Sequence, residues 1–458
     1  MHLSAMQLPA DFTALMRQQW GEEISSSLCE SLSSTEPSVS VRLNRAKLAA
    51  GNSDFAFQSS AERVPWCPDA YWLTSRPAFT FDPLLHAGAY YVQDASSMFL
   101  AQVVRQHVSS PSVVLDLCAA PGGKSTLLRA LLPDGSLLVS NEPIAKRAQI
   151  LAENITKWGH PDTAVTQNYP ADFASLTSFF DFIVADVPCS GEGMFRKEEE
   201  AVRDWSLDAV RACQQRQRDI LRDVWPALKP GGLLCYSTCT FNHLEDEDNV
   251  EWICRQLGAE VVPLRVDATW NVLGCHHFLP SRLRGEGFFL CLLRKTSASS
   301  GVTPSAVRRS KGVAEKVPTA VCDWVQGDYV FSACKGIVTA FPVRHAALLP
   351  SLRRLHLLTE GVRIAEPKGR DWQPSHALAL SLARRSDAFP VAELDYDTSL
   401  AYLRREAICV DAPRGYVLVA FRGLPLGFVN NLGNRANNLY PPEWRIRSGY
   451  TTAFTLAN

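Results

Sequence analysis

The spacing of hydrophobic and polar positions changes along the chain at about Val113. From there, short apolar stretches alternate with segments whose apolar residues recur at helical spacing, which predicts strands separated by helices. Regular alternation of strands and helices indicates an open, mostly parallel sheet with helices on both faces. The predicted strands lie at 113–117, 136–142, 181–187, 231–238 and 287–295.

The flanking parts of the chain have different patterns. Residues 1–110 combine a helix after Asp11, a strand at 39–43 and a helix after Asp94, and we interpret them as an adaptor to the central block. Residues 297–319 are rich in Ser, Thr and small residues and are predicted to be a linker. Short strand-like stretches in 320–458 predict a mixed β domain, which leaves 111–296 for the central sheet.

Composition excludes several classes of protein. Of 458 residues, 46% are hydrophobic and 20% charged, which is typical of a globular protein rather than a disordered one. No apolar run approaches the roughly 20 residues that cross a bilayer, and the first twenty residues lack the pattern of a secretory signal. We therefore expect a cytoplasmic protein that does not associate with membranes, and we expect it to be a monomer.

The net charge of −1 conceals an asymmetry. Residues 301–458 carry 20 Lys and Arg against 13 Asp and Glu, whereas residues 1–300 carry 26 against 34. Arginine dominates the basic part, which suits contacts to phosphate groups but equally suits solvated helix faces.

The spacing of the 13 cysteines does not indicate a metal site or a set of disulfide bonds. None belongs to a C-x-x-C pair, so we predict no metal site. The run Cys275-His276-His277 does not change this prediction, because adjacent residues on an extended chain point to opposite sides.

A glycine-rich turn follows the first strand of the central block. Asp116 ends that strand, and small residues lead through Gly122 and Gly123 into a helix, which is the form of a nucleotide or adenosyl site. An ATPase P-loop is the main competitor, but its first glycine would have to stand where Cys118 is. The next strand ends in Glu142, whose carboxylate could accept hydrogen bonds from the hydroxyls of a ribose.

Two further strands end in reactive side chains. Asp186 and Cys189 follow one strand, and Cys239 follows another. Since parallel strands present their carboxyl ends at one edge, we expect these side chains to share a crevice with the glycine-rich turn. Either cysteine alone could instead be a buried structural residue.

Four motifs, in this order, resemble those of the Sun-type RNA cytosine-5 methyltransferases: DLCAAPGGKST, NEP, DVPCSGEGMFRK and YSTCTF. The N-terminal RLN and RPAFTFDPLLHAGAYYVQDASS are similar to that family's N-terminal region, and YLRRE, LPLGFV and NNLYPPEWR resemble the PUA-like part of its RsmF group. The resemblance implies a Rossmann-like α/β methyltransferase sheet with an N-terminal α/β extension and a C-terminal PUA-like mixed β domain.

The resemblance also implies the chemistry of the site. Cytosine C5 is a poor nucleophile, so a thiolate, here Cys239, would add to C6 and make C5 reactive. Asp186 would lie against the base and share or donate a proton at N3, which requires a protonated or strongly hydrogen-bonded carboxyl group. Cys189 would assist the breakdown of the covalent adduct after methylation.

The implied cofactor is S-adenosylmethionine. Its methionine part would lie against the glycine-rich segment and its ribose against Glu142, and Asp186 would also contribute to the cofactor site. The segment after the third strand has no acidic residue at the family's usual place, so Asn168 is the residue we predict for adenine. The glycine-rich segment consists of Cys118, Ala119, Ala120, Pro121, Gly122, Gly123 and Lys124, of which Lys124 could instead lie near the catalytic carboxylates.

RNA is the expected partner, because the resemblance points to small-subunit ribosomal RNA or the assembled small subunit. The target base must be unstacked to be reached. Arg196 and Lys197 could contact phosphate or could begin a solvated helix, and Arg42 and Asn44 would extend the RNA surface. Two alternatives stay open: the same reaction on tRNA, and a ribosome-assembly factor that binds RNA without turnover.

Overall fold

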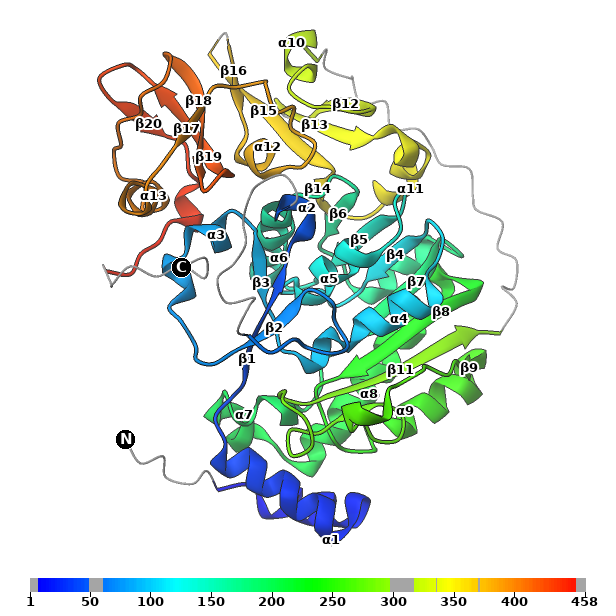
Figure 1. Ribbon diagram of the computed structural model, residues 1–458. Helices are drawn as coiled ribbons and strands as arrows, with labels where there is room; N and C mark the ends of the chain where they lie inside the picture. The colour runs from blue at the N-terminus through cyan, green and yellow to red at the C-terminus, as the bar shows by residue number, and fades with distance from the viewer. Residues whose placement is uncertain (1–6, 49–60, 297–316, 335, 370, 450–458) are drawn as a thin grey trace.

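A nine-stranded sheet forms the centre of the computed structural model, which describes residues 7–48, 61–296, 317–334, 336–369 and 371–449 (Figure 1). The strands run in the order β10-β11-β8-β7-β4-β5-β6-β14, and β9 pairs with β11. Their bounds are β4 Val113–Asp116, β5 Leu137–Asn141, β6 Thr163–Thr166, β7 Phe180–Asp186, β8 Leu228–Thr238, β9 Ala259–Val261, β10 His277–Phe278, β11 Phe288–Lys295 and β14 Leu357–Glu360.

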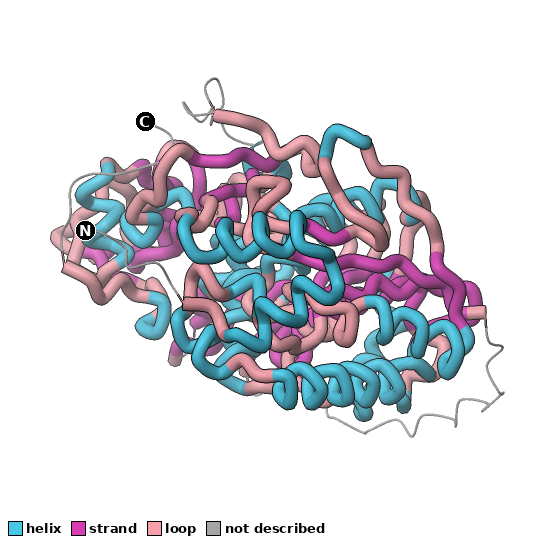
Figure 2. The backbone as a smooth tube through the Cα atoms, turned by 90° about the horizontal axis from the view of Figure 1, so that it is seen from below, coloured by secondary structure: helices cyan, strands magenta, loops and turns pink. Residues whose placement is uncertain are grey.

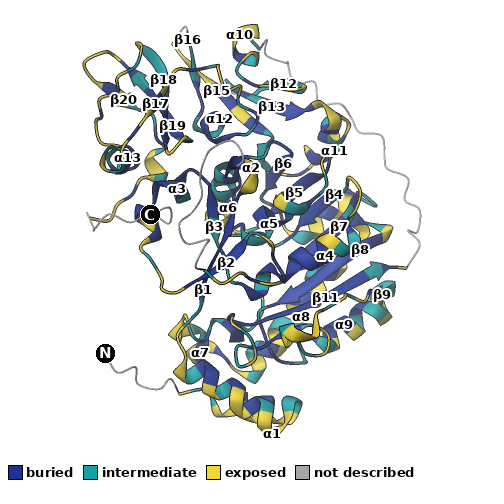
Figure 3. Ribbon diagram, viewed as in Figure 1, coloured by how far each residue is buried: buried dark blue, intermediate teal, exposed yellow. Residues whose placement is uncertain are grey.

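The five central strands, β4 to β8, are parallel to one another, which confirms the predicted α/β class. Both faces are covered, so successive residues of one strand enter different cores: Val114 packs with Leu127 on one face, and Leu115 packs with the cluster of Leu221 on the other. Figures 2 and 3 show the strands as a buried layer with helices against it. The helices are α4 Leu100–His107, α5 Gly123–Leu131, α6 Ala145–Trp158, α7 Glu199–Asp204, α8 Leu207–Val224 and α9 Glu247–Trp252.

The long helix α8 ends at Val224, and a 3₁₀ turn follows at Trp225–Ala227. Pro226 has no N–H to donate to a continuing helix, so the chain turns there and Leu228 begins β8.

The N-terminal region consists of a long helix and a three-stranded sheet. The predicted strand at 39–43 is confirmed as β1, and Asp94 accepts a hydrogen bond from the Ser97 N–H at the start of the turn that leads into α4. The elements are α1 Ala10–Ser34, β1 Val39–Leu43, α2 Arg45–Leu48, β2 Ala70–Leu73, α3 Pro83–His86 and β3 Tyr90–Val92.

The C-terminal region contains two four-stranded sheets, in the orders β12-β13-β15-β16 and β17-β18-β19-β20. The strands are β12 Tyr329–Cys334, β13 Ile337–Pro342, β15 Val362–Lys368, β16 Asp371–Pro374, β17 Val391–Glu393, β18 Gly415–Phe421, β19 Leu424–Asn431 and β20 Ala436–Asn438. The helices are α10 Thr319–Cys322, α11 Leu349–Leu352, α12 His376–Leu380 and α13 Tyr396–Leu403.

This region is built into the rest of the molecule. Strand β14 adds to the edge of the central sheet by antiparallel pairing with β6, and the core of β18 and β19 is continuous with that of β1 and β2. Residues 297–316 of the predicted linker lie outside the part of the chain that the structure describes. Within the described ranges, the helices are too short or too polar to cross a membrane.

Candidate active site

The carboxyl ends of β4, β7 and β8 meet at one edge of the sheet, above a cavity of about 370 Å³. The cavity is lined by the glycine-rich turn, by Asp186 and by Cys239, so the structure brings these residues together as expected. Tyr91 and Gln93 of the N-terminal region also line it. Both lie in the stretch RPAFTFDPLLHAGAYYVQDASS, whose resemblance could have marked them.

The two cysteines of the predicted site touch each other. Their sulfur atoms lie 3.0 Å apart, although the residues come from separate loops after β7 and β8. The hydrogen bond to Cys239, together with burial, raises the pKa of Cys189 well above its usual value. Cys189 therefore keeps its proton over the usual pH range.

Asp186 forms an ion pair with Lys124. The Lys124 Nζ lies 2.8 Å from one carboxylate oxygen, and the Ser237 hydroxyl donates to the other oxygen at 2.8 Å. Burial alone would lower the pKa of Lys124, but the charges of Asp186 and Asp116 outweigh it and raise that pKa. Of the two positions that the sequence left open for Lys124, the structure therefore shows the one beside the Asp186 carboxylate.

The glycine-rich turn rests on the buried Asp116. One carboxylate oxygen accepts from the Ser125 hydroxyl at 2.6 Å, and burial raises the pKa of Asp116 to about 7. The other oxygen has no hydrogen-bond partner among the described residues. Gly122 takes a left-handed conformation with φ of 117°, which only glycine adopts without strain. An orphaned buried oxygen beside exposed backbone is a suitable place for a polar cofactor.

Arg42 and Asn44 are not RNA contacts, contrary to the prediction. Both are 1% exposed. The Arg42 guanidinium donates to the Thr126 hydroxyl at 2.6 Å and to Gln93 at 3.1 Å, and the Asn44 amide donates to main-chain carbonyls at 3.0 Å. Arg42 therefore holds the start of α5, directly after the glycine-rich turn.

Glu142 lies next to that turn, at the end of β5. Its side chain is 2% exposed, accepts from the Ile144 N–H at 3.0 Å and lies 3.4 Å from the Arg147 guanidinium. Arg147 also donates to the Ala120 carbonyl at 3.2 Å, so it joins the predicted ribose site to the turn.

Asn168 has a different partner from the one predicted. Its amide donates to the His356 carbonyl at 3.2 Å and accepts from the His356 N–H at 3.1 Å, which fixes the chain just before β14. Asn168 is 7% exposed, so these contacts hold a mostly buried side chain against the segment before β14. Ile144 and Tyr169, which are 49% and 66% exposed, are the apolar side chains that flank this position.

Arg196 and Lys197 have different surroundings. The Arg196 side chain is 6% exposed, and its guanidinium lies 3.1 Å from Glu286 and donates to the Thr35 hydroxyl at 2.7 Å. Because these groups already occupy the guanidinium, the predicted contact of Arg196 with phosphate is wrong. Lys197 is exposed and lines the catalytic cavity.

His276 and His277 do point to different neighbours. His276 packs near Phe99, whereas His277 lies between Trp20 and Phe289. His277 also comes together with Asp246 and Glu247, with candidate ligand atoms within 4.8 Å of one another, a grouping that sequence spacing did not reveal.

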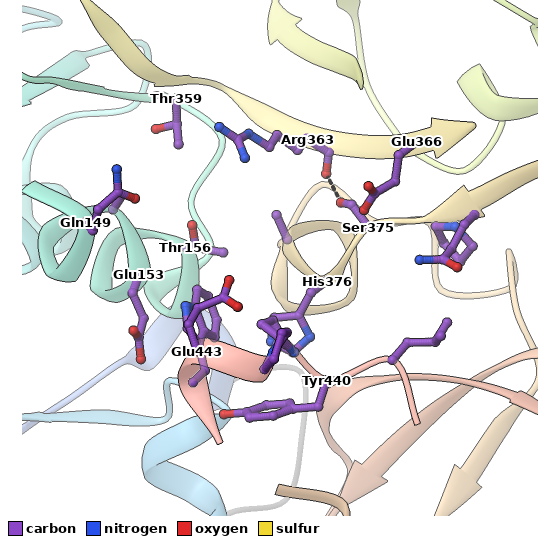
Figure 4. Close-up of a pocket in the computed structure, with 18 of the residues that line it drawn as sticks. Gln149, Glu153, Thr156, Thr359, Arg363, Glu366, Ser375, His376, Tyr440 and Glu443 are labelled. Atoms are coloured by element: carbon purple, nitrogen blue, oxygen red, sulfur yellow. Dashed lines mark hydrogen bonds between the residues drawn. The ribbon is translucent and has the colours of Figure 1, made fainter. Parts of the chain in front are cut away.

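A second cavity, of about 530 Å³, lies away from the cysteines between α6, β15, α12 and residues 438–444. Figure 4 shows Gln149 and Glu153 on α6 at the left of the view, with His376 and Tyr440 to their right. The His376 ring nitrogens are buried without a partner among the described residues, and a Cβ at Gly427 would lie 2.9 Å from one of them. His376 is also among the residues that line the cavity.

The sheet, the glycine-rich turn and the strand-end carboxylates define a Rossmann-like methyltransferase. Family models match three parts of the chain: the N-terminal domain of 16S rRNA methyltransferase RsmF at 8–95, 16S rRNA methyltransferase RsmB/F at 106–294, and the methyltransferase RsmF PUA domain at 389–446.

Known proteins agree with these matches. The ribosomal RNA small subunit methyltransferase F of Salmonella paratyphi A is 30% identical over 443 residues, which is 90% of each chain. The chain therefore belongs to the RsmF family of methyltransferases. A methyltransferase homolog protein from Pyrococcus horikoshii is 25% identical, with a TM-score of 0.53 over 63% of this chain and 96% of that one. NSun6 from the same organism, solved with SFG, shares the fold at 18% identity and a TM-score of 0.52, over 63% of this chain and 98% of that one.

Proposed function

We propose that this protein transfers a methyl group from S-adenosylmethionine to C5 of a cytosine in small-subunit ribosomal RNA, in the cytoplasm, through a covalent bond between Cys239 and C6. The observation that carries the proposal is the pair of sulfurs 3.0 Å apart beside the Lys124–Asp186 ion pair. The substrate follows from the names of the matching families and relatives.

In the first step, the Cys239 thiolate adds to C6, and the electron pair of the C5–C6 bond moves toward C5 and N3. Asp186 accepts from both Lys124 and Ser237, so it is strongly hydrogen-bonded, as its expected role at N3 requires. The charged Lys124, 2.8 Å from Asp186, is the acid that stabilises this negative charge, while the carboxylate accepts a hydrogen bond from the base. S-adenosylmethionine supplies the electrophilic methyl group that C5 attacks.

In the second step, a solvent water takes the proton from C5, the electron pair of that C–H bond re-forms the C5–C6 double bond, and the bond between Cys239 and C6 breaks so that Cys239 departs as a thiolate. Cys189 keeps its own proton and lies within hydrogen-bond distance of the departing sulfur. A thiol in this place stabilises the negative charge that returns to Cys239 and so favours breakdown of the adduct.

The cofactor fits the residues at the edge of the sheet. The orphaned oxygen of Asp116 and the backbone from Cys118 to Lys124 would hold the methionine part, and Ile144 and Tyr169 would flank the adenine. Arg147 covers Glu142 and is half exposed, so ribose hydroxyls reach the carboxylate when the arginine moves aside.

Glu142→Gln is expected to weaken S-adenosylmethionine binding about tenfold or more. Glutamine can keep the contact to the Ile144 N–H, but it puts an NH₂ donor where the carboxylate would accept from the ribose, and hydrogen bonds to charged groups contribute about 1.5–3 kcal/mol. Calorimetric titration measures the change. Glu260→Gln, on β9 at the opposite edge of the sheet, is the control. Equal affinities of the two variants would place the ribose elsewhere.

RNA would reach the cavity past Lys197 and along a neighbouring groove. This groove, of about 560 Å³, lies between the end of α1 and residues 280–285, and Arg76, Arg196 and Arg284 line it. Arg196 joins the two cavities, because its partner Glu286 lines the catalytic one. Arg76 is exposed and therefore free to meet phosphate.

Replacing Arg76 and Lys197 together by Glu is expected to raise Kd for RNA tenfold or more, because two phosphate contacts become repulsive. The slope of log affinity against log salt should fall by between 1 and 2, since each contact to single-stranded RNA releases about 0.7 counterion. Fluorescence anisotropy at several salt concentrations measures both effects. Arg255→Glu, an exposed arginine in the helical turn Ile253–Gly258 that follows α9, is the control. A double variant whose affinity and salt slope equal those of the control would contradict this path for the RNA.

The experiment that tests the proposed function uses methyl-labelled S-adenosylmethionine with free small-subunit rRNA, assembled small subunits and tRNA in separate reactions. Nucleoside analysis should find labelled 5-methylcytidine in one of the two ribosomal pools. Label found only in tRNA would support cytosine-5 methylation as the reaction but would contradict ribosomal RNA as the substrate. No label in any pool, with RNA still bound, would favour an RNA-binding assembly factor.

A further inference from the structure

A chain of buried polar side chains joins the two cysteine loops behind the catalytic cavity. Glu192 belongs to the loop that carries Cys189, and Asn242 and Glu245 belong to the segment that follows Cys239. All three side chains are buried, with 0% exposure. Fully buried carboxylates are rare without a compensating role, because each loses its hydration.

Glu192 holds the loop of the other cysteine. One of its oxygens accepts from the Phe241 N–H at 2.6 Å, and the neighbouring Gly193 N–H donates to the Cys239 carbonyl at 2.7 Å. A Cβ at Gly193 would lie 2.8 Å from that same carbonyl oxygen, so a larger residue would push the loops apart. The backbone that follows Cys239 is therefore fixed from the Cys189 loop.

Glu245, which follows Cys239, in turn holds the loop that carries Cys189. Its carboxylate accepts from the Ser190 N–H at 3.1 Å and from the Gln217 amide at 2.6 Å. The same Gln217 amide donates to the Pro188 carbonyl at 3.0 Å. The main chain on both sides of Cys189 is thus held by Glu245 and its partner.

Asn242 links the two carboxylates. Its amide nitrogen donates to Glu192 at 2.8 Å and to Glu245 at 2.9 Å, one hydrogen for each, and its oxygen accepts from the Glu245 N–H at 2.9 Å. Burial raises the pKa of Glu192 to about 7 and also raises that of Glu245, so both carboxylates depend on the donors around them. Removing a hydrogen-bond donor from a buried carboxylate costs stability, and the single amide of Asn242 donates to both carboxylates.

We infer that Asn242 is a positioning residue that keeps the Cys189 thiol in register with Cys239 by bridging Glu192 and Glu245. It acts through these carboxylates and is not among the residues that line the catalytic cavity. The inference rests on the proposed function. Adduct formation requires Cys239 alone, whereas breakdown of the adduct requires both thiols, so loosening the link should slow breakdown most.

Asn242→Ala, incubated with RNA and S-adenosylmethionine, is therefore expected to lower kcat tenfold or more while KM for RNA changes less than threefold. The fraction of protein in a denaturant-stable adduct should rise above that of the wild type. Glu245→Gln is the second variant: it keeps the volume but turns an NH₂ group toward the donors of Ser190 and Gln217, and it should show the same pattern. Thermal melting and cofactor affinity establish that each variant is folded.

Asn431→Ala is the matched control, because Asn431 is also a buried amide that donates to main-chain carbonyls, but in the C-terminal sheet. It should lower stability without changing the adduct fraction. Wild-type kcat in a folded Asn242→Ala protein, or a loss of kcat without extra adduct, would overturn the inference. Failure of the proposed function looks different: the wild type itself would then make no 5-methylcytidine.

Discussion

Cys239→Ala is expected to abolish 5-methylcytidine formation, with a loss of at least about a thousandfold in kcat, as for other removed catalytic nucleophiles. Among the described residues that line the catalytic cavity, the other cysteine is Cys118. Burial raises the pKa of Cys118, so it cannot substitute as a thiolate. Single-turnover nucleoside analysis measures the loss.

Binding should separate this effect from misfolding. Cys239 is at the end of β8 and is not needed to build the glycine-rich turn, so affinity for S-adenosylmethionine should stay within about twofold of the wild type. Cys213→Ala, a half-buried cysteine on α8, serves as the control and should retain turnover. Turnover by Cys239→Ala would refute the assignment of the nucleophile.

Cys189→Ala is expected to form the covalent bond to RNA but to release it slowly. Without the second thiol, the charge that returns to Cys239 loses its hydrogen-bond donor at 3.0 Å, and the adduct should accumulate to a substantial fraction of the enzyme. A protein–RNA band on a denaturing gel, formed only with cofactor and RNA present, measures this.

The double variant Cys189→Ala with Cys239→Ala is the control, because it lacks the nucleophile and should show no such band. If Cys189→Ala turns over normally, or loses activity without any band, Cys189 is not part of adduct breakdown.

The grouping of Asp186, Cys189 and Cys239 could be predicted from sequence because it depends on a local pattern. Each follows an apolar strand, and parallel strands present their carboxyl ends at one edge. Neither the 3.0 Å contact between the sulfurs nor the pairing of Lys124 with Asp186 follows from that pattern, since both depend on how separate loops pack.

The RNA-binding residues show where sequence reasoning failed. Arg42 was read as a surface cation, but its partner Thr126 lies 84 positions further along the chain, and no local signal predicts that contact. Asn168 similarly meets His356, 188 positions away, because β14 joins the central sheet. Contacts between distant segments decide burial, and burial decides whether a polar side chain faces solvent or supports the fold.

Mass spectrometry of the trapped adduct tests the central claim most directly. Cys189→Ala protein is incubated with RNA and S-adenosylmethionine, digested with protease and ribonuclease, and the peptide that carries the nucleotide is sequenced. The account predicts a methylated cytidine attached to the sulfur of Cys239. A nucleotide on any other residue, or an adduct that forms equally without Cys239, would contradict it.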